Sequence, residues 1–223
     1  MNIDNAIEYI KLGNDKKTPK TCRFLELGLG IWVLIGVGWG YMAGNTAKII
    51  GVIMFALYLA MLLVVIVMSV LRITQTKLLI LLIITYASWI IQLSMLETQL
   101  LVINYGMSTD LLFVHLPSIL CPILIGIAEN RTINANKPFF NAKKFKEIGW
   151  AYGGCLGVVG SSIAMILLEG KNQNTVVAVV LVCCMLMVMA NSMGLACSIL
   201  KLCYINKLKR MELCEISDFD KRF

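Results

Sequence analysis

Charged and chemically reactive residues are scarce in this sequence. Only 15% of the 223 residues are Asp, Glu, Lys or Arg, and there is a single His, whereas a soluble domain has about 25% charged residues. The sequence contains no Cys-x-x-Cys, no His-Glu-x-x-His pair, no Gly-x-Ser-x-Gly elbow and no P-loop. These absences argue against a zinc site, a metalloprotease, a serine hydrolase and a nucleotide hydrolase. We therefore expect a protein that is not an enzyme and that holds no metal and no cofactor.

Long apolar runs dominate the rest of the chain. Hydrophobic residues make up 59% of it, and the mean hydropathy is +0.81. Six runs come close to the ~20 residues that a helix needs to cross the hydrocarbon core of a membrane. They lie at residues 24–43, 49–71, 78–96, 111–128, 148–168 and 176–200. A water-soluble core has no use for so much continuous apolar sequence, so the pattern predicts an all-α, polytopic membrane helix bundle with six transmembrane helices.

The basic residues predict how the chain is oriented. Of the 20 Lys and Arg residues, all but Lys48 and Lys171 fall in alternate segments that include both chain ends. Because basic residues stay on the cytoplasmic side, both termini are expected inside the cell, in a multi-pass protein of the cell membrane. The predicted parts are a cytoplasmic N-terminal segment 1–23, a membrane domain 24–204 and a cytoplasmic tail 205–223. The net charge of +7 then indicates attraction to anionic inner-leaflet lipids, with no nucleic acid as partner.

Two smaller expectations follow from this topology. None of the eight Cys residues lies in a predicted outer loop, so we expect no disulfide. Near the N-terminus, Ile3, Ile7 and Ile10 recur at helical spacing. This spacing fits a short helix on the inner membrane surface, and a partly disordered polar terminus is the alternative.

Glycines recur every four residues in two of the runs. They are Gly36, Gly40 and Gly44 in the first run and Gly149, Gly153 and Gly157 in the fifth. Residues at this spacing share one helix face. In lipid, a face without side chains allows a second helix to approach closely, so we predict that both sets are helix-packing strips. A groove used for gating is the alternative.

A few polar residues fall inside the runs. His115 lies about one turn from the outer end of the fourth run, and Gln92 and Asn191 lie deeper. A His can sense pH, relay protons or simply face interfacial water, while a buried amide needs a partner on a neighbouring helix. These three residues are the candidate intramembrane polar sites, with packing as the alternative role. Glu97 follows the end of the third run and is expected in an outer loop.

The loop between the fourth and fifth runs combines basic and aromatic residues. It begins with a proline, which interrupts a helix, and continues with an Asn that can cap the next helix. Lys residues and aromatic residues follow. Its members are Pro138, Phe139, Asn141, Lys143, Lys144, Phe145 and Trp150. Such a stretch is typical of an interfacial anchor whose lysines meet lipid phosphates. Docking of a partner protein is the alternative.

This loop resembles the mark of a family of small, uncharacterised bacterial membrane proteins. Their mark is a Gly-x-Pro-Phe turn, then an Asn that opens a basic stretch ending in Ile-Gly-Trp. From Asn141 to Trp150 the spacing is the same, whereas 138–141 is two residues shorter and Asn136 replaces the Gly. The resemblance covers residues 78–205. The family usually has four spans, so the first two runs would be an addition. Its members are often encoded beside small helix-turn-helix regulators, which implies signalling or stress response.

Together these features favour a non-catalytic membrane protein that acts by contact. A regulatory, sensing or immunity-type accessory component fits, with a protein partner or a second copy of the chain bound to it. The alternative is a small-solute transporter or permease subunit. A transporter would need polar groups near the midplane and broken helices, and the sequence offers no intramembrane charge as a coupling site.

Overall fold

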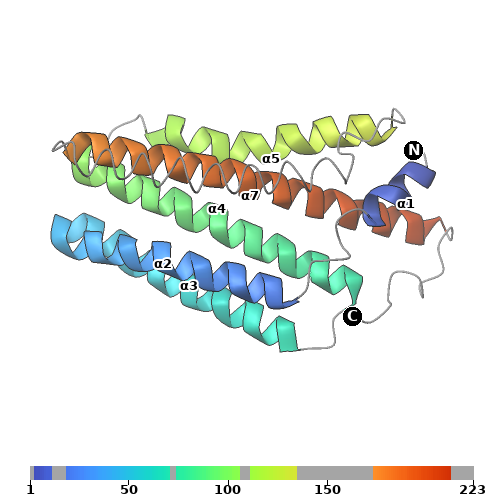
Figure 1. The fold of residues 1–223 in the computed structure, drawn as a ribbon, viewed down its shortest axis with the longest axis horizontal. Coiled ribbons are helices and arrows are strands. Elements are labelled where there is room, and N and C mark those ends of the chain that lie inside the picture. The colour runs from blue at the N-terminus through green and yellow to red at the C-terminus, as the bar shows by residue number, and fades with distance from the viewer. Residues whose placement is uncertain (1–2, 12–18, 71–73, 106–110, 135–172, 212–223) are drawn as a thin grey trace.

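The computed structural model of the chain describes residues 3–11, 19–70, 74–105, 111–134 and 173–211, and all its regular elements are helices (Figure 1). The helices are α1 (Ile3–Lys11), α2 (Pro19–Ala43), α3 (Asn45–Val70), α4 (Gln75–Tyr105), α5 (Leu111–Asn134) and α7 (Gln173–Arg210). The prediction of an all-α protein is therefore confirmed for the described part of the chain. The fifth predicted run with its glycines Gly149, Gly153 and Gly157 lies outside the described residues. So does the basic-aromatic loop 136–150.

Within the described residues, four helices are long and apolar enough to cross a membrane. They are Pro19–Ala43, Asn45–Val70, Thr76–Ile103 and Val180–Arg210. The helix α3 shows why the solvent around them is not water, since large apolar side chains such as Ile49 and Leu63 are exposed along its length. A water-soluble protein rarely exposes so much contiguous apolar surface. The chain is accordingly a membrane protein with several apolar helices.

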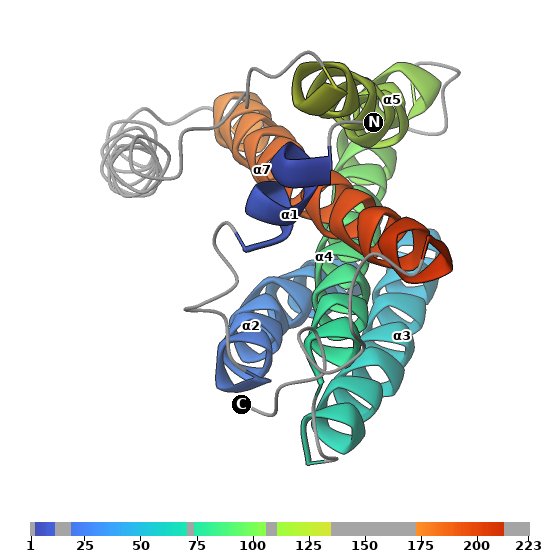
Figure 2. The same cartoon turned by 90° about the vertical axis from the view of Figure 1, so that its right-hand side faces the viewer.

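The helices form layers in the order α5, α7, α4, with α2 and α3 together on the far side of α4 (Figures 1 and 2). The α2–α3 hairpin turns at a single residue, Gly44, which has a φ of 114°. Such a backbone conformation favours glycine, because a side chain would clash there. In the described part of the chain, no neighbouring atom lies within 4 Å of the position that a Cβ at Gly44 would take. Gly44 is thus a turn residue, and its place in a packing strip stays a prediction.

Gly36 and Gly40 lie where α2 meets α3 and α4. A Cβ at Gly40 would be 2.5 Å from Gln99 Nε2 and 2.7 Å from the carbonyl oxygen of Ala47. A Cβ at Gly36 would be 3.0 Å from Met54 Cε. Gln99 Nε2 also donates a hydrogen bond of 2.9 Å to the Ala47 carbonyl. The three helices therefore meet across a surface that has no room for a further side chain.

The directions of α4, α5 and α7 follow from the residues that meet. On α4 and α7, Tyr86 packs against Gly194, and Glu97 interacts electrostatically with Cys184, so these helices are antiparallel. Glu97 also lies beside His115 near the start of α5. At the other end of α5, Glu129 contacts Cys197 of α7. The helices α5 and α7 therefore run in the same direction, opposite to α4.

Candidate functional site

Glu97 lies inside a helix, where the sequence predicted a loop. The helix α4 continues to Tyr105, and the candidate span Thr76–Ile103 includes Glu97. Its side chain is only 1% exposed. Glutamate is a good helix former, and apolar residues resume after it, so a single charge does not end this helix. The expectation that Glu97 lies in an outer loop is wrong. Its carboxyl is buried within α4.

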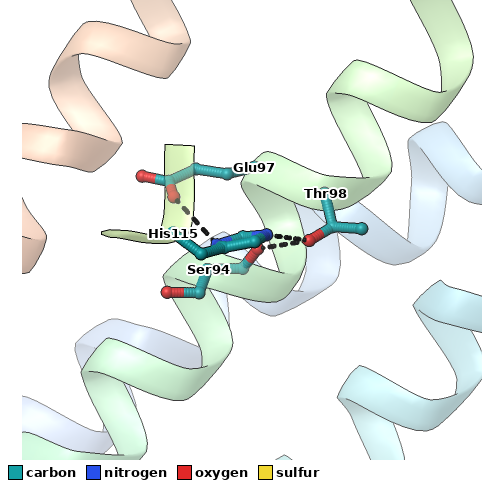
Figure 3. Close-up of polar contacts among 4 residues, drawn as sticks. All are labelled: Ser94, Glu97, Thr98 and His115. Carbon is teal, nitrogen blue, oxygen red and sulfur yellow. Dashed lines mark hydrogen bonds and ion pairs between the residues drawn. The ribbon is translucent and has the colours of Figure 1, made fainter. Parts of the chain in front are cut away.

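His115 of α5 lies beside this carboxyl (Figure 3). Its Nδ1 is 3.8 Å from Glu97 Oε2, and its Nε2 is 2.6 Å from Thr98 Oγ1. The Thr98 hydroxyl donates its only proton to the Ser94 carbonyl at 2.9 Å. It therefore accepts from His115, which assigns the proton of a neutral imidazole to Nε2. The unprotonated Nδ1 then faces Glu97.

A proton is the natural occupant of the space between Nδ1 and the carboxyl. Among the described residues, His115 Nδ1 and both carboxyl oxygens of Glu97 have no hydrogen-bond partner. An ionised carboxylate that is buried without donors is unfavourable by several kcal/mol. Either a proton on the carboxyl or a positive charge on His115 removes this cost. The Cys184 thiol of α7 also interacts electrostatically with Glu97.

The two amides predicted as polar sites have other surroundings. Asn191 is half-buried and donates to the Met187 carbonyl of its own helix at 2.8 Å, although the sequence predicted a bond to a neighbouring helix. Gln92 is buried, and its Oε1 has no donor within the part of the chain that the structure describes. Neither hydrogen-bonds Glu97 or His115. Of the three predicted sites, His115 alone is joined to a second titratable side chain.

Two further carboxyls are buried among the described residues. Glu26 of α2 accepts a hydrogen bond of 2.7 Å from the Ser88 hydroxyl of α4. Glu129 of α5 accepts from the Tyr9 hydroxyl and, at 3.1 Å, from the Cys197 thiol. Both lie at or near the end of an apolar run, where sequence alone suggests access to water. Over the described ranges, no three His, Cys, Asp or Glu side chains come together as a metal site would require.

Comparison of the chain with protein-family models, curated proteins and solved structures gives no match. The resemblance to the family of small bacterial membrane proteins rests on a loop outside the described residues, and it stays a prediction. We call the side chains of Glu97 and His115 the Glu97–His115 pair. The geometry of this pair is the basis for the proposed function.

Proposed function

We propose that the chain crosses the membrane six times, with both termini in the cytoplasm. Because α5 and α7 run in the same direction, Asn134 and Gln173 lie toward opposite ends of the bundle. In the six-span proposal the chain between them crosses the membrane once more, over a distance comparable to the length of α5, roughly 36 Å. A return through hydrocarbon requires a helix, and the apolar run 148–168 has the necessary length. The distribution of Lys and Arg supports the cytoplasmic placement of both ends.

Reporter fusions test this topology. Fusions after Asn45, Asn104 and Asn172 should report an external position, because each follows an odd number of crossings. Fusions at the N-terminus and after Arg210 should report the cytoplasm. A cytoplasmic signal from the Asn104 fusion would contradict the six-span arrangement.

We further infer that the protein senses protons at the outer surface and acts by contact. The observation that carries this function is the unprotonated Nδ1 of His115 facing the Glu97 carboxyl. Histidine changes its charge between about pH 5 and 8, and titratable groups inside a membrane are functional by default. Glu97 lies eight residues before the end of α4 at Tyr105, roughly 12 Å along the axis. In the proposed topology this end is the outer one.

The position of the pair separates sensing from transport. A sensor needs proton access from one side, whereas a transporter brings its coupling site into contact with both sides of the membrane. The pair is close to one end of α4, and His115 retains 27% exposure there. This one-sided placement favours a sensor. Signalling or an immunity-type accessory role is the setting in which we expect it to operate.

Hydrogen exchange of α5 at two pH values tests the sensing function. In nanodiscs, amide protection of residues 111–134 should differ several-fold between pH 5.5 and pH 8, after correction for the intrinsic rates. The physical reason is that protonation changes the attraction between His115 and Glu97, which holds α5 to α4. Glu97→Gln should remove the difference. The matched control is Glu26→Gln, which alters another buried carboxyl and should retain it.

A proton-flux assay tests the transport alternative. Proteoliposomes that contain the protein and an internal pH dye should show no more proton uptake under a pH gradient than empty liposomes. Uptake that Glu97→Gln abolishes would overturn the sensing function in favour of a transporter. A wild-type protein whose α5 exchange is the same at both pH values would also contradict sensing.

A further inference from the structure

Polar side chains near both ends of the helix α5 contact neighbouring helices. Between His115 and Glu129, large apolar side chains face outward, with Ile119 62% and Leu124 60% exposed. His115 and Glu129 are 14 residues apart, which places them roughly 21 Å apart along the axis and on nearly the same face. The contacts at the Glu129 end therefore hold α5 at the end opposite to the Glu97–His115 pair.

At that end the helix α1 lies against α7 and α5 (Figure 2), and its Tyr9 is central to the contacts. Its hydroxyl donates to Glu129, whose other oxygen accepts from the Cys197 thiol of α7. The ring of Tyr9 meets Tyr204 edge-on at 6.3 Å between centroids. Lys201 Nζ lies 5.6 Å from the Tyr9 ring centroid. One residue of the N-terminal helix thus contacts both α5 and α7.

Apolar contacts dock the rest of α1. Ala6 and Ile10 are fully buried, in a cluster that includes Ile205 and Leu208 of α7. Burial raises the pKa of Tyr9, and the nearby Cys197 and Glu129 raise it further. Its hydroxyl therefore keeps its proton at physiological pH and remains a donor to Glu129.

We infer that α1 is a latch that fixes this end of α5 against α7 and that its undocking frees α5 to move. A helix of nine residues is marginal by itself in water. Its docking therefore depends on the few buried side chains named above, and such peripheral units open before the rest of a protein. These contacts of α1 form the latch without any contribution from the Glu97–His115 pair. Its use as the cytoplasmic readout of the Glu97–His115 pair rests on the proposed function.

The rate of Cys197 alkylation reports whether α1 is docked, because Tyr9 of α1 is hydrogen-bonded to Glu129, the carboxyl that also accepts a hydrogen bond from the Cys197 thiol. The full-length protein in nanodiscs is treated with N-ethylmaleimide at pH 7, and each Cys is followed by peptide mass spectrometry. Tyr9→Phe keeps the ring but removes the hydroxyl. It should raise the Cys197 rate roughly fivefold, the factor that one ordinary hydrogen bond produces in an equilibrium. Ile10→Asn, which places an amide in the apolar cluster, should have a larger effect.

Two internal comparisons keep the result specific. The buried Cys184, near the other end of α7, should react at an unchanged rate, which excludes general unfolding. Tyr41→Phe alters an exposed tyrosine of α2 and should leave the Cys197 rate as in the wild type. If both Tyr9→Phe and Ile10→Asn leave Cys197 at the wild-type rate, the latch is refuted.

A pH series separates the latch from the sensing function. If Tyr9→Phe exposes Cys197 while the α5 exchange of the wild type ignores pH, sensing fails and the latch stands. If α5 responds to pH but neither variant exposes Cys197, the latch fails and sensing stands. The Cys197 rate is divided by that of the exposed Cys203. If this ratio changes with pH in the wild type but not in Glu97→Gln, the result supports both.

Discussion

Gly40→Leu is expected to destabilise the protein by about 1–3 kcal/mol, the usual range for overpacking, whereas Gly38→Leu should have little effect. A Cβ at Gly40 would come within 2.7 Å of the Ala47 carbonyl oxygen, which is backbone and cannot rotate away. It would also displace Gln99, whose amide bonds this same carbonyl. At Gly38, two residues away on the same helix, no neighbouring atom of the described residues lies within 4 Å of the added Cβ.

The comparison of the two variants controls for composition, because both add one leucine to the same apolar helix. Thermal melts of wild type, Gly38→Leu and Gly40→Leu in one detergent give the result. In a membrane no hydrophobic force drives helices together, so close backbone approach supplies much of the attraction. Equal losses of stability in both variants would mean that the contact of α2 with α3 and α4 contributes little.

The glycine positions illustrate what periodicity can and cannot predict. The four-residue spacing grouped Gly36 with Gly40, because residues at that spacing share a face in any α-helix. The same spacing also included Gly44, which lies at the turn between α2 and α3. Its role depends on a positive φ at the turn between two helices, and spacing contains no information about where a helix stops.

Glu97 was misplaced for a different physical reason. A hydropathy run ends at the first strongly polar residue, so the third run was ended at Leu96. The helix itself has no such limit, and α4 continues for nine residues after Leu96. What makes a buried carboxyl tolerable is the imidazole of His115, 18 residues away on another helix. Pairing between distant residues cannot be read from either apolar run alone.

For α1, the sequence predicted a helix with one apolar face but not the surface that this face contacts. The spacing of Ile3, Ile7 and Ile10 indicated one apolar face, and α1 has Ile10 fully buried. The sequence suggested a lipid surface for that face, or no order at all. The structure instead places Tyr9 and Ile10 against α5 and α7. Nothing local distinguishes a face that meets lipid from one that meets protein.

Replacing His115 alone is expected to be worse than replacing both members of the Glu97–His115 pair. His115→Leu leaves the Glu97 carboxyl buried with no compensating group, and breaking a buried ion pair in this way typically costs about 3–5 kcal/mol. Because His115 is 27% exposed, we expect about 2 kcal/mol. Replacing both partners by leucine removes the polar group that needs compensation, so Glu97→Leu/His115→Leu should recover most of the loss.

Unfolding of the two single variants, the double variant and the wild type at pH 8 forms a double-mutant cycle. The penalty of His115→Leu should shrink as the pH falls, since a protonated carboxyl no longer carries an unpaired charge. If the double variant is as unstable as the sum of the single ones, the two side chains are not coupled. The double variant also separates stability from function: its α5 helix should be well protected from exchange, and that protection should no longer depend on pH. A stable bundle without a pH response is the outcome expected if the pair has been retained for sensing and not for packing.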